Sequence, residues 1–150
     1  MDKTNVMAYF SIYGDHFPIN EVTQLLGIEP TKSYNKGEVI VRPKNDNVIS
    51  HTINYRIETA WELSSGYQES NDVKAQLDQI LEPLKNKTAL INHLKMKYKL
   101  ECLISIVIKI ENGLTPGLHL DTEQIDFANR INAEFDIDMY ANPYSSDFNM

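Results

Sequence analysis

Alternation of apolar and polar residues is the strongest pattern in this chain, and it is longest over residues 52–64. Every second residue there lies on one side, which is mostly apolar and carries Trp61, the single tryptophan of the sequence. Side chains of an extended strand point alternately to its two faces, so this period of two predicts one buried face and one wet face. We therefore expect a long antiparallel strand with Trp61 in the core.

Four further segments have strand-like patterns. Alternation predicts strands over residues 6–13, 100–110 and 135–140, and a turn signal precedes a brief strand over residues 39–41. The segment over residues 100–110 is apolar on both sides, which is typical of a strand that is covered on both faces. We expect it at the centre of the sheet.

Apolar residues at helical spacing predict four helices. The first follows Pro18, whose fixed φ suits a first helical turn. The second follows Asp72, a residue that can cap a helix. The third covers residues 88–98. The fourth follows Asp121, which with Gln124 makes a capping-box pattern.

The order of these elements is strand, helix, two strands, helices, strand, helix, strand. It predicts one α+β domain over residues 6–140, followed by a C-terminal tail over residues 141–150. The first six elements follow the split βαβ pattern of ferredoxin-like sheets, with a helix and a strand added. We expect helices packed on one face of an antiparallel or mixed sheet, and a polar surface loop over residues 42–50.

Length and charge narrow the classes of function. The 150 residues suit one domain, and 21 acidic against 14 basic residues give a formal net charge of −7. A nucleic-acid interface needs clustered basic residues, so we expect no nucleic-acid partner. The acidic surface can keep the protein soluble or attract a basic protein, and the composition favours solubility. The longest apolar run, residues 102–110, is too short to span a bilayer, so no membrane partner is expected.

Location and cofactor chemistry also follow from the sequence. It has no signal-peptide pattern and one cysteine, Cys102, so we expect a cytoplasmic protein. Cys102 shares a face with four isoleucines, which predicts a buried, inert thiol. The four histidines lack metal-ligand spacing, and the six glycines form no phosphate-binding loop. We expect no cofactor and no enzymatic activity.

Asp136 and Asp138 lie two residues apart in the last predicted strand, so their carboxylates project from the same face. Such a pair can bind a divalent cation or share a proton, which makes it the best metal candidate in the chain. On an exposed strand, paired acids also discourage edge-to-edge aggregation. The pattern favours this second role.

Five short motifs occur in order: residues 10–14 (FSIYG), 26–31 (LGIEPT), 36–38 (KGE), 61–65 (WELSS) and 136–140 (DIDMY). Over roughly residues 6–140 the chain resembles the DUF4279 family of small bacterial proteins, which is known only as a domain of unknown function. The resemblance implies a stand-alone cytoplasmic domain without an established reaction, and some such families lie beside toxin genes as immunity proteins. A site common to the family would draw on the polar members of these motifs: Lys36, Glu38, Glu62, Asp136 and Asp138.

Three hypotheses follow. The first is a non-enzymatic protein-interaction module for a basic partner, and a toxin-neutralising immunity protein is one form of it. The second is a small-molecule or metal-binding module, with a site near Lys36, Glu38, Trp61 and Glu62. The third is a hydrolase that uses Asp136, Asp138 or a histidine, and it requires these groups to converge in a cleft.

Overall fold

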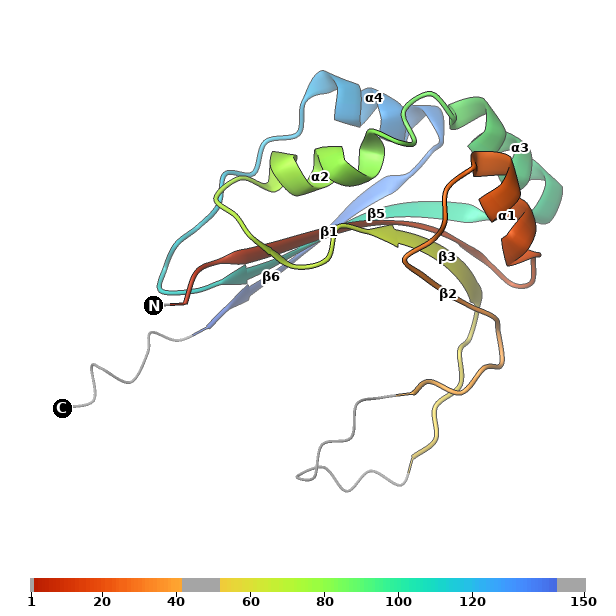
Figure 1. Cartoon of the computed structure of the whole chain (residues 1–150), viewed down its shortest axis with the longest axis horizontal. Coiled ribbons are helices and arrows are strands. Elements are labelled where there is room, and N and C mark those ends of the chain that lie inside the picture. The colour runs from red at the N-terminus through yellow and green to blue at the C-terminus, as the bar shows by residue number, and fades with distance from the viewer. Residues whose placement is uncertain (1, 42–51, 143–150) are drawn as a thin grey trace.

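The computed structural model describes residues 2–41 and 52–142, which fold as a six-stranded mixed sheet with four helices on one face (Figure 1). In chain order, the elements are β1 (Asn5–Gly14), α1 (Ile19–Leu26), β2 (Lys32–Tyr34), β3 (Thr59–Ser64), β4 (Gln68–Glu69), α2 (Val73–Leu81), α3 (Thr88–Tyr98), β5 (Glu101–Ile110), α4 (Thr122–Arg130) and β6 (Glu134–Ala141). The predicted α+β class is therefore confirmed.

The strands lie in the order β2-β3-β1-β5-β6, and the short β4 pairs with the start of β1. Strand β1 is antiparallel to both β3 and β5, and β2 is antiparallel to β3. This arrangement has the predicted split βαβ pattern, in which β3 lies between β1 and β2, but β2 (Lys32–Tyr34) takes the place expected for residues 39–41. The added helix α4 then crosses over the sheet, so that β6 pairs with β5 in parallel. The added strand thus lies at an edge.

The core fills the space between the sheet and the four helices (Figure 1). Alternate residues of β1 and β5 point into it, and Phe10 meets Phe127 of α4 edge to face, with ring centroids 6.2 Å apart. Trp61 is completely buried, and its indole Nε1–H donates to Thr23 Oγ1 at 3.1 Å. The core role predicted for Trp61 is confirmed.

Strand β5 is an interior strand with neighbours on both sides, but the centre of the sheet is β1, and β5 lies next to the edge strand β6. The expectation that β5 would be covered on both faces was also wrong. Helices cover the face with its isoleucines, and no helix of residues 2–41 or 52–142 covers the other (Figure 1). On that second face Ser105 and Val107 are buried nevertheless, because they lie between side chains of the flanking strands β1 and β6. The apolar character of β5 thus reflects its interior place between two strands.

The predicted strand over residues 52–64 is correct only in its second half. Strand β3 begins at Thr59, which pairs with Gly14, the last residue of β1. Residues before Thr59 therefore have no residue of β1 to pair with. Residues 52–58 instead run beside residues 37–41, and the predicted strand over residues 39–41 is reduced to one bridge, Val39 to Tyr55. The loop predicted over residues 42–50 lies outside the described residues.

Strands β2 and β4 were not predicted. Their three and two residues are too short for an alternation to be recognised. Each forms because a longer strand presents an edge: β2 pairs with β3, and β4 pairs with Asn5 and Val6 of β1.

The helix termini follow the sequence closely. The Asp72 carboxylate accepts from the Lys74 N–H at 3.1 Å and caps α2. At α4 the capping box is complete: the Asp121 carboxylate accepts from the Gln124 N–H, and Gln124 Oε1 accepts from the Asp121 N–H, both at 2.9 Å. The capping-box prediction is confirmed, and it fixes where the crossover to β6 begins.

Replacing Gly27 by alanine is expected to lower the free energy of unfolding by roughly 1–2 kcal/mol. Gly27 ends α1 with a φ of 67°, a left-handed conformation that disfavours a Cβ atom. The nearest atom to that Cβ would be Lys87 Nζ at 4.0 Å, so the loss would come from backbone strain and not from a clash. Urea denaturation measures it. Gly27→Asn is the control and should lose less, and equal losses in both variants would contradict this explanation.

Candidate functional site

The face of the sheet opposite the helices, here called the open face, carries the candidate site. The register of the strands shows which side chains share it, because residues directly paired across strands point to the same side. Three cross-strand rows make up its centre: Glu62, Ser11, Leu103 and Glu134; Ser64, Tyr9, Ser105 and Asp136; and Met7, Val107 and Asp138. The open face therefore mixes polar and apolar side chains. The carboxylates of these rows lie on β3, which carries Glu62, and on β6, which carries Glu134, Asp136 and Asp138.

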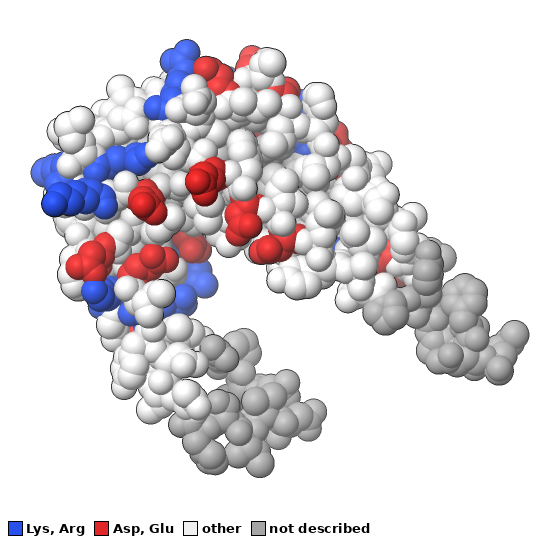
Figure 2. Space-filling model, turned by 180° about the vertical axis from the view of Figure 1, so that it is seen from behind, with Lys and Arg blue, Asp and Glu red and all other residues white. Residues whose placement is uncertain are grey.

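Three of these carboxylates, Glu134, Asp136 and Asp138, form the acidic row of β6. All three are exposed, and none makes an ion pair or a side-chain hydrogen bond with another described residue. Successive members are about 6.6 Å apart along an extended strand. Figure 2 shows acidic side chains along the hollow side of the molecule. The row is thus a line of free negative charge at a sheet edge.

A tyrosine on this face is hydrogen-bonded to a further carboxylate. The Tyr13 hydroxyl donates to Glu101 Oε2 at 3.0 Å, across the β1–β5 ladder. Burial, followed by this hydrogen bond and the charge of Glu101, raises the pKa of Tyr13 to about 12. Tyr13 therefore stays a neutral donor, and the exposed Glu101 adds a further carboxylate to this face.

Glu62 lies on the open face directly beside Ser11 of β1. Burial raises the pKa of its carboxyl group above the ordinary value, against the opposing attraction of Lys32 and Arg56. None of the described residues forms an ion pair with Glu62 within 4 Å. Its charge is thus incompletely compensated, which would favour a cation from a partner.

Glu62→Gln is expected to raise the free energy of unfolding at pH 7. The folded protein holds the Glu62 proton more tightly than the unfolded chain does, so stability is lost as the pH rises through the raised pKa. Glutamine has no proton to lose, and the advantage of the variant should shrink as the pH falls towards 4.5, the ordinary pKa. Urea unfolding between pH 4.5 and 7 measures the difference. A difference that does not change with pH would show that ionisation is not its cause.

The four residues predicted to bind a ligand do not converge. Trp61 and Glu62 are adjacent in β3 and point to opposite faces, and buried Trp61 has no surface to offer. The Lys36 ammonium pairs with the Asp15 carboxylate, while Glu38 Oε1 accepts from Asn35 Nδ2 at 3.0 Å. Of the predicted set, only Glu62 belongs to the open face.

The predicted metal pair is at the surface, on edge strand β6. Asp136 and Asp138 share the open face, as the spacing predicted. Across the described part of the chain, no group of three or more His, Cys, Asp or Glu side chains is arranged to hold a metal ion. The described histidines are exposed, and Cys102 is buried, which raises the pKa of its thiol to about 12. The convergence that a hydrolase requires is not seen among these residues.

A second surface lies on the arm, which we define as residues 37–41 and 52–58. The two segments run antiparallel, with the Arg56 N–H donating to the Glu38 carbonyl at 2.7 Å and the Ile40 N–H to the Asn54 carbonyl at 2.8 Å. The arm extends from the body beyond β3 (Figure 1). Five of its apolar side chains are more than half exposed: Val39, Val41, Ile53, Tyr55 and Ile57. Exposed apolar groups of this kind often mark contact sites.

A groove of about 320 Å³ lies at the base of the arm, and it contains none of the four predicted binding residues. Tyr34 forms one side of it, and the Arg56 guanidinium lies over the Tyr34 ring, 3.8 Å from its centre. Such stacking of a cation on an aromatic face orders both side chains. The groove therefore has a defined wall close to the acidic open face.

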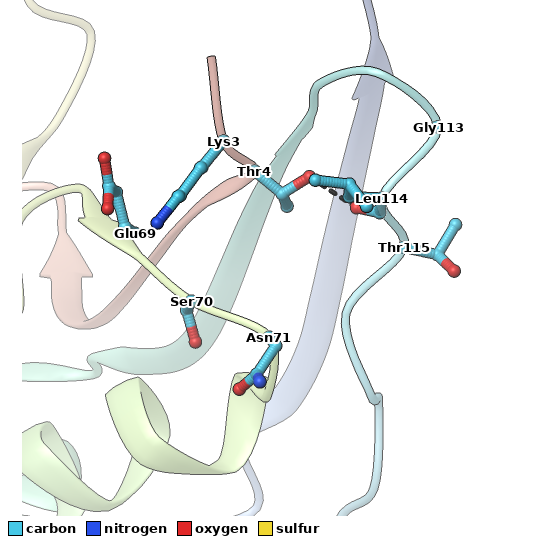
Figure 3. Close-up of a pocket in the computed structure, with 8 residues that line it drawn as sticks. All are labelled: Lys3, Thr4, Glu69, Ser70, Asn71, Gly113, Leu114 and Thr115. Carbon is cyan, nitrogen blue, oxygen red and sulfur yellow. Dashed lines mark hydrogen bonds between the residues drawn. The ribbon is translucent and has the colours of Figure 1, made fainter. Parts of the chain in front are cut away.

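A larger cavity of about 670 Å³ opens where β1 begins and β5 ends (Figure 3). It is lined by Lys3, Thr4, Glu69, Ser70, Asn71, Gly113, Leu114 and Thr115. The Thr4 hydroxyl donates to the Leu114 carbonyl and accepts from the Glu111 N–H at 3.1 Å, which ties the 111–115 loop to β1. The side chains of Lys3, Asn71 and Thr115 make no ion pair or hydrogen bond with the described residues. The sequence pattern did not indicate this cavity.

The fold and these surfaces define an α+β domain with one helix-covered and one open sheet face. The chain belongs to the family described as Domain of unknown function (DUF4279), whose model matches residues 3–142. This match confirms the resemblance inferred from the five motifs. The comparisons found no matching curated protein and no matching solved structure. No helix in the described ranges is long and apolar enough to cross a membrane.

Proposed function

We propose that this protein is a non-enzymatic interaction module that binds a basic protein through its open face. One observation carries the proposal: in the part of the chain that the structure describes, a sheet face without a helical layer carries unpaired carboxylates, including the acidic row Glu134, Asp136 and Asp138. A layer of partner protein would cover this face and neutralise its charge. A toxin-neutralising immunity protein is the form of this function in which the partner is a basic toxin.

Electrostatics supports a basic partner over an acidic or neutral one. The net charge of −7 attracts a basic protein over long range, and the acidic row concentrates that attraction at one edge. Complementary charge accelerates encounter and excludes partners of the wrong sign. The exposed apolar side chains of the arm would add the desolvated contacts that charge alone does not supply.

Capture from a lysate of the native cell tests the proposal, with the wild-type chain and two charge variants as baits. Asp136→Lys with Asp138→Lys reverses part of the acidic row, while Glu29→Lys with Glu123→Lys makes the same charge change at exposed positions outside the open face. We expect one basic protein in equimolar amount on the wild type and on the control variant, and none on the row variant. Equal retention by all three baits would contradict the proposal.

The cavity at Lys3 supports a second candidate function, the binding of a small polar molecule. Its volume of about 670 Å³ lies in the range typical of small-molecule sites. Lys3 and Glu69 place opposite charges on its wall, which would suit a zwitterionic ligand (Figure 3). A thermal-shift screen with amino acids and short peptides tests this function. Stabilisation that is lost in Lys3→Ala would support it, and no shift with any compound would exclude these ligand classes.

A further inference from the structure

The outer edge of β6 has no strand partner within the described ranges. It is an edge strand of eight residues that pairs with β5 on one side only. The unpaired N–H and C=O groups of such an edge can hydrogen-bond to an added strand, a common way of binding an extended peptide. Eight residues are enough to align several pairs of hydrogen bonds.

The two faces of β6 specify different neighbours for an added strand. On the open face it presents the acidic row of Glu134, Asp136 and Asp138. On the helix-covered face it presents Phe135 and Ile137, which are half-buried, and Met139, which is 61% exposed. A strand that continues the sheet here would place one set of alternate side chains beside carboxylates and the other beside apolar groups.

We propose that the basic partner contributes an extended segment that adds to the outer edge of β6, with Lys or Arg at alternate positions and apolar residues between them. This inference rests on the proposed function and names the mode of binding. Opposite charges on neighbouring strands stabilise their pairing, and like charges destabilise it. The acidic row therefore disfavours pairing with the same strand of a second copy, the protective role that the sequence indicated, and selects a basic strand.

Ser105 is an independent observation at the same place. Its side chain belongs to the open face, next to Asp136 in the parallel ladder, and only 2% of the residue is exposed. Its hydroxyl has no hydrogen-bond partner among the described residues, which is uncommon for a buried polar group. Strands lie about 4.8 Å apart, so a strand added outside β6 is two spacings from β5, and a long basic side chain that crosses Asp136 reaches this hydroxyl once the side chains that cover Ser105 move aside. Lysine and arginine have that length and donate hydrogen bonds.

Peptide binding tests the inference directly. The probe is an eight-residue peptide that alternates lysine and valine, labelled with fluorescein and titrated with the full chain in an anisotropy assay. A peptide of the same composition with four lysines followed by four valines controls for charge alone. A third peptide, alternating but N-methylated at every backbone amide, cannot donate hydrogen bonds to the edge of β6 in either strand direction. We expect the alternating peptide to bind at least tenfold more tightly than either control.

Protein variants separate this inference from the proposed function. Asp136→Lys with Asp138→Lys should abolish the preference for the alternating peptide, while Glu29→Lys with Glu123→Lys should keep it. Equal binding of all three peptides that still depends on the acidic row would overturn strand addition and leave the basic-partner proposal standing. Strand addition would also be overturned if the protein bound all three peptides equally and the row variant bound them as the wild type does. The proposed function would then be tested by the lysate capture alone.

Discussion

Trp61→Ala is expected to lower the free energy of unfolding by about 3–5 kcal/mol, as large-to-small changes of buried aromatic side chains do. Trp61 is completely buried between β3 and the helices, so its removal leaves a cavity that the surrounding side chains fill only in part. A loss of this size is a large share of the 5–15 kcal/mol that is typical of whole domains. Urea denaturation followed by circular dichroism measures the loss.

Thr23→Val separates the hydrogen bond of Trp61 from its volume. Valine has nearly the shape of threonine but leaves the buried indole N–H without its acceptor at 3.1 Å, at a cost of about 1–3 kcal/mol. The native tryptophan fluorescence of this variant should stay blue-shifted, because the ring stays buried. If Trp61→Ala lost less than 1 kcal/mol, the central place of Trp61 in the core would be contradicted.

Asp136→Lys with Asp138→Lys is expected to weaken binding of the captured basic partner by at least about 100-fold. Like charges brought together at an interface cost several kcal/mol, and each 1.4 kcal/mol is a factor of ten in affinity. Both side chains are exposed and have no partner among the described residues, so the charge reversal should leave the unfolding free energy within about 0.5 kcal/mol of the wild type. Titration calorimetry at several salt concentrations measures the affinity.

The salt dependence of the affinity and a variant of equal net charge are the controls for this prediction. Wild-type binding should weaken as salt rises, because free charges on the open face are screened. The Glu29→Lys and Glu123→Lys variant has the same net charge as the row variant, so it should lose only the small long-range contribution. Equal losses in the two variants would mean that total charge, and not the acidic row, attracts the partner.

Much of the fold follows from local sequence. Pro18, Gly27 and Asp121 define helix boundaries through chemistry that acts within one turn, and the structure has these boundaries. The alternation in β1, β5 and β6 likewise predicted their strands and their inward residues. Where the prediction was wrong, the cause is not local: the strand at residues 52–64 is cut short because β1 ends at Gly14, opposite Thr59.

The candidate site was harder to predict, because it depends on which residues pair across strands. Asp136 and Asp138 could be placed on one face from their spacing, but their position beside Ser105 and Val107 follows only from the parallel pairing of β6 with β5. The sequence did offer one signal for the open face: in each alternating strand, the more polar set of alternate residues lies on that face. The cavity at Lys3 joins segments that are more than 40 residues apart in the chain, and no local pattern connects them.

Amide hydrogen exchange of the chain, with and without the captured basic partner, tests the central claim most directly. The claim is that the partner binds at the open face and at the outer edge of β6. We expect the partner to slow exchange of the outward amides of residues 134–141, which have no strand partner among the described residues. Helices α2 and α4, on the covered face, should be unchanged (Figure 1). Protection confined to these helices, with β6 unaffected, would contradict the account.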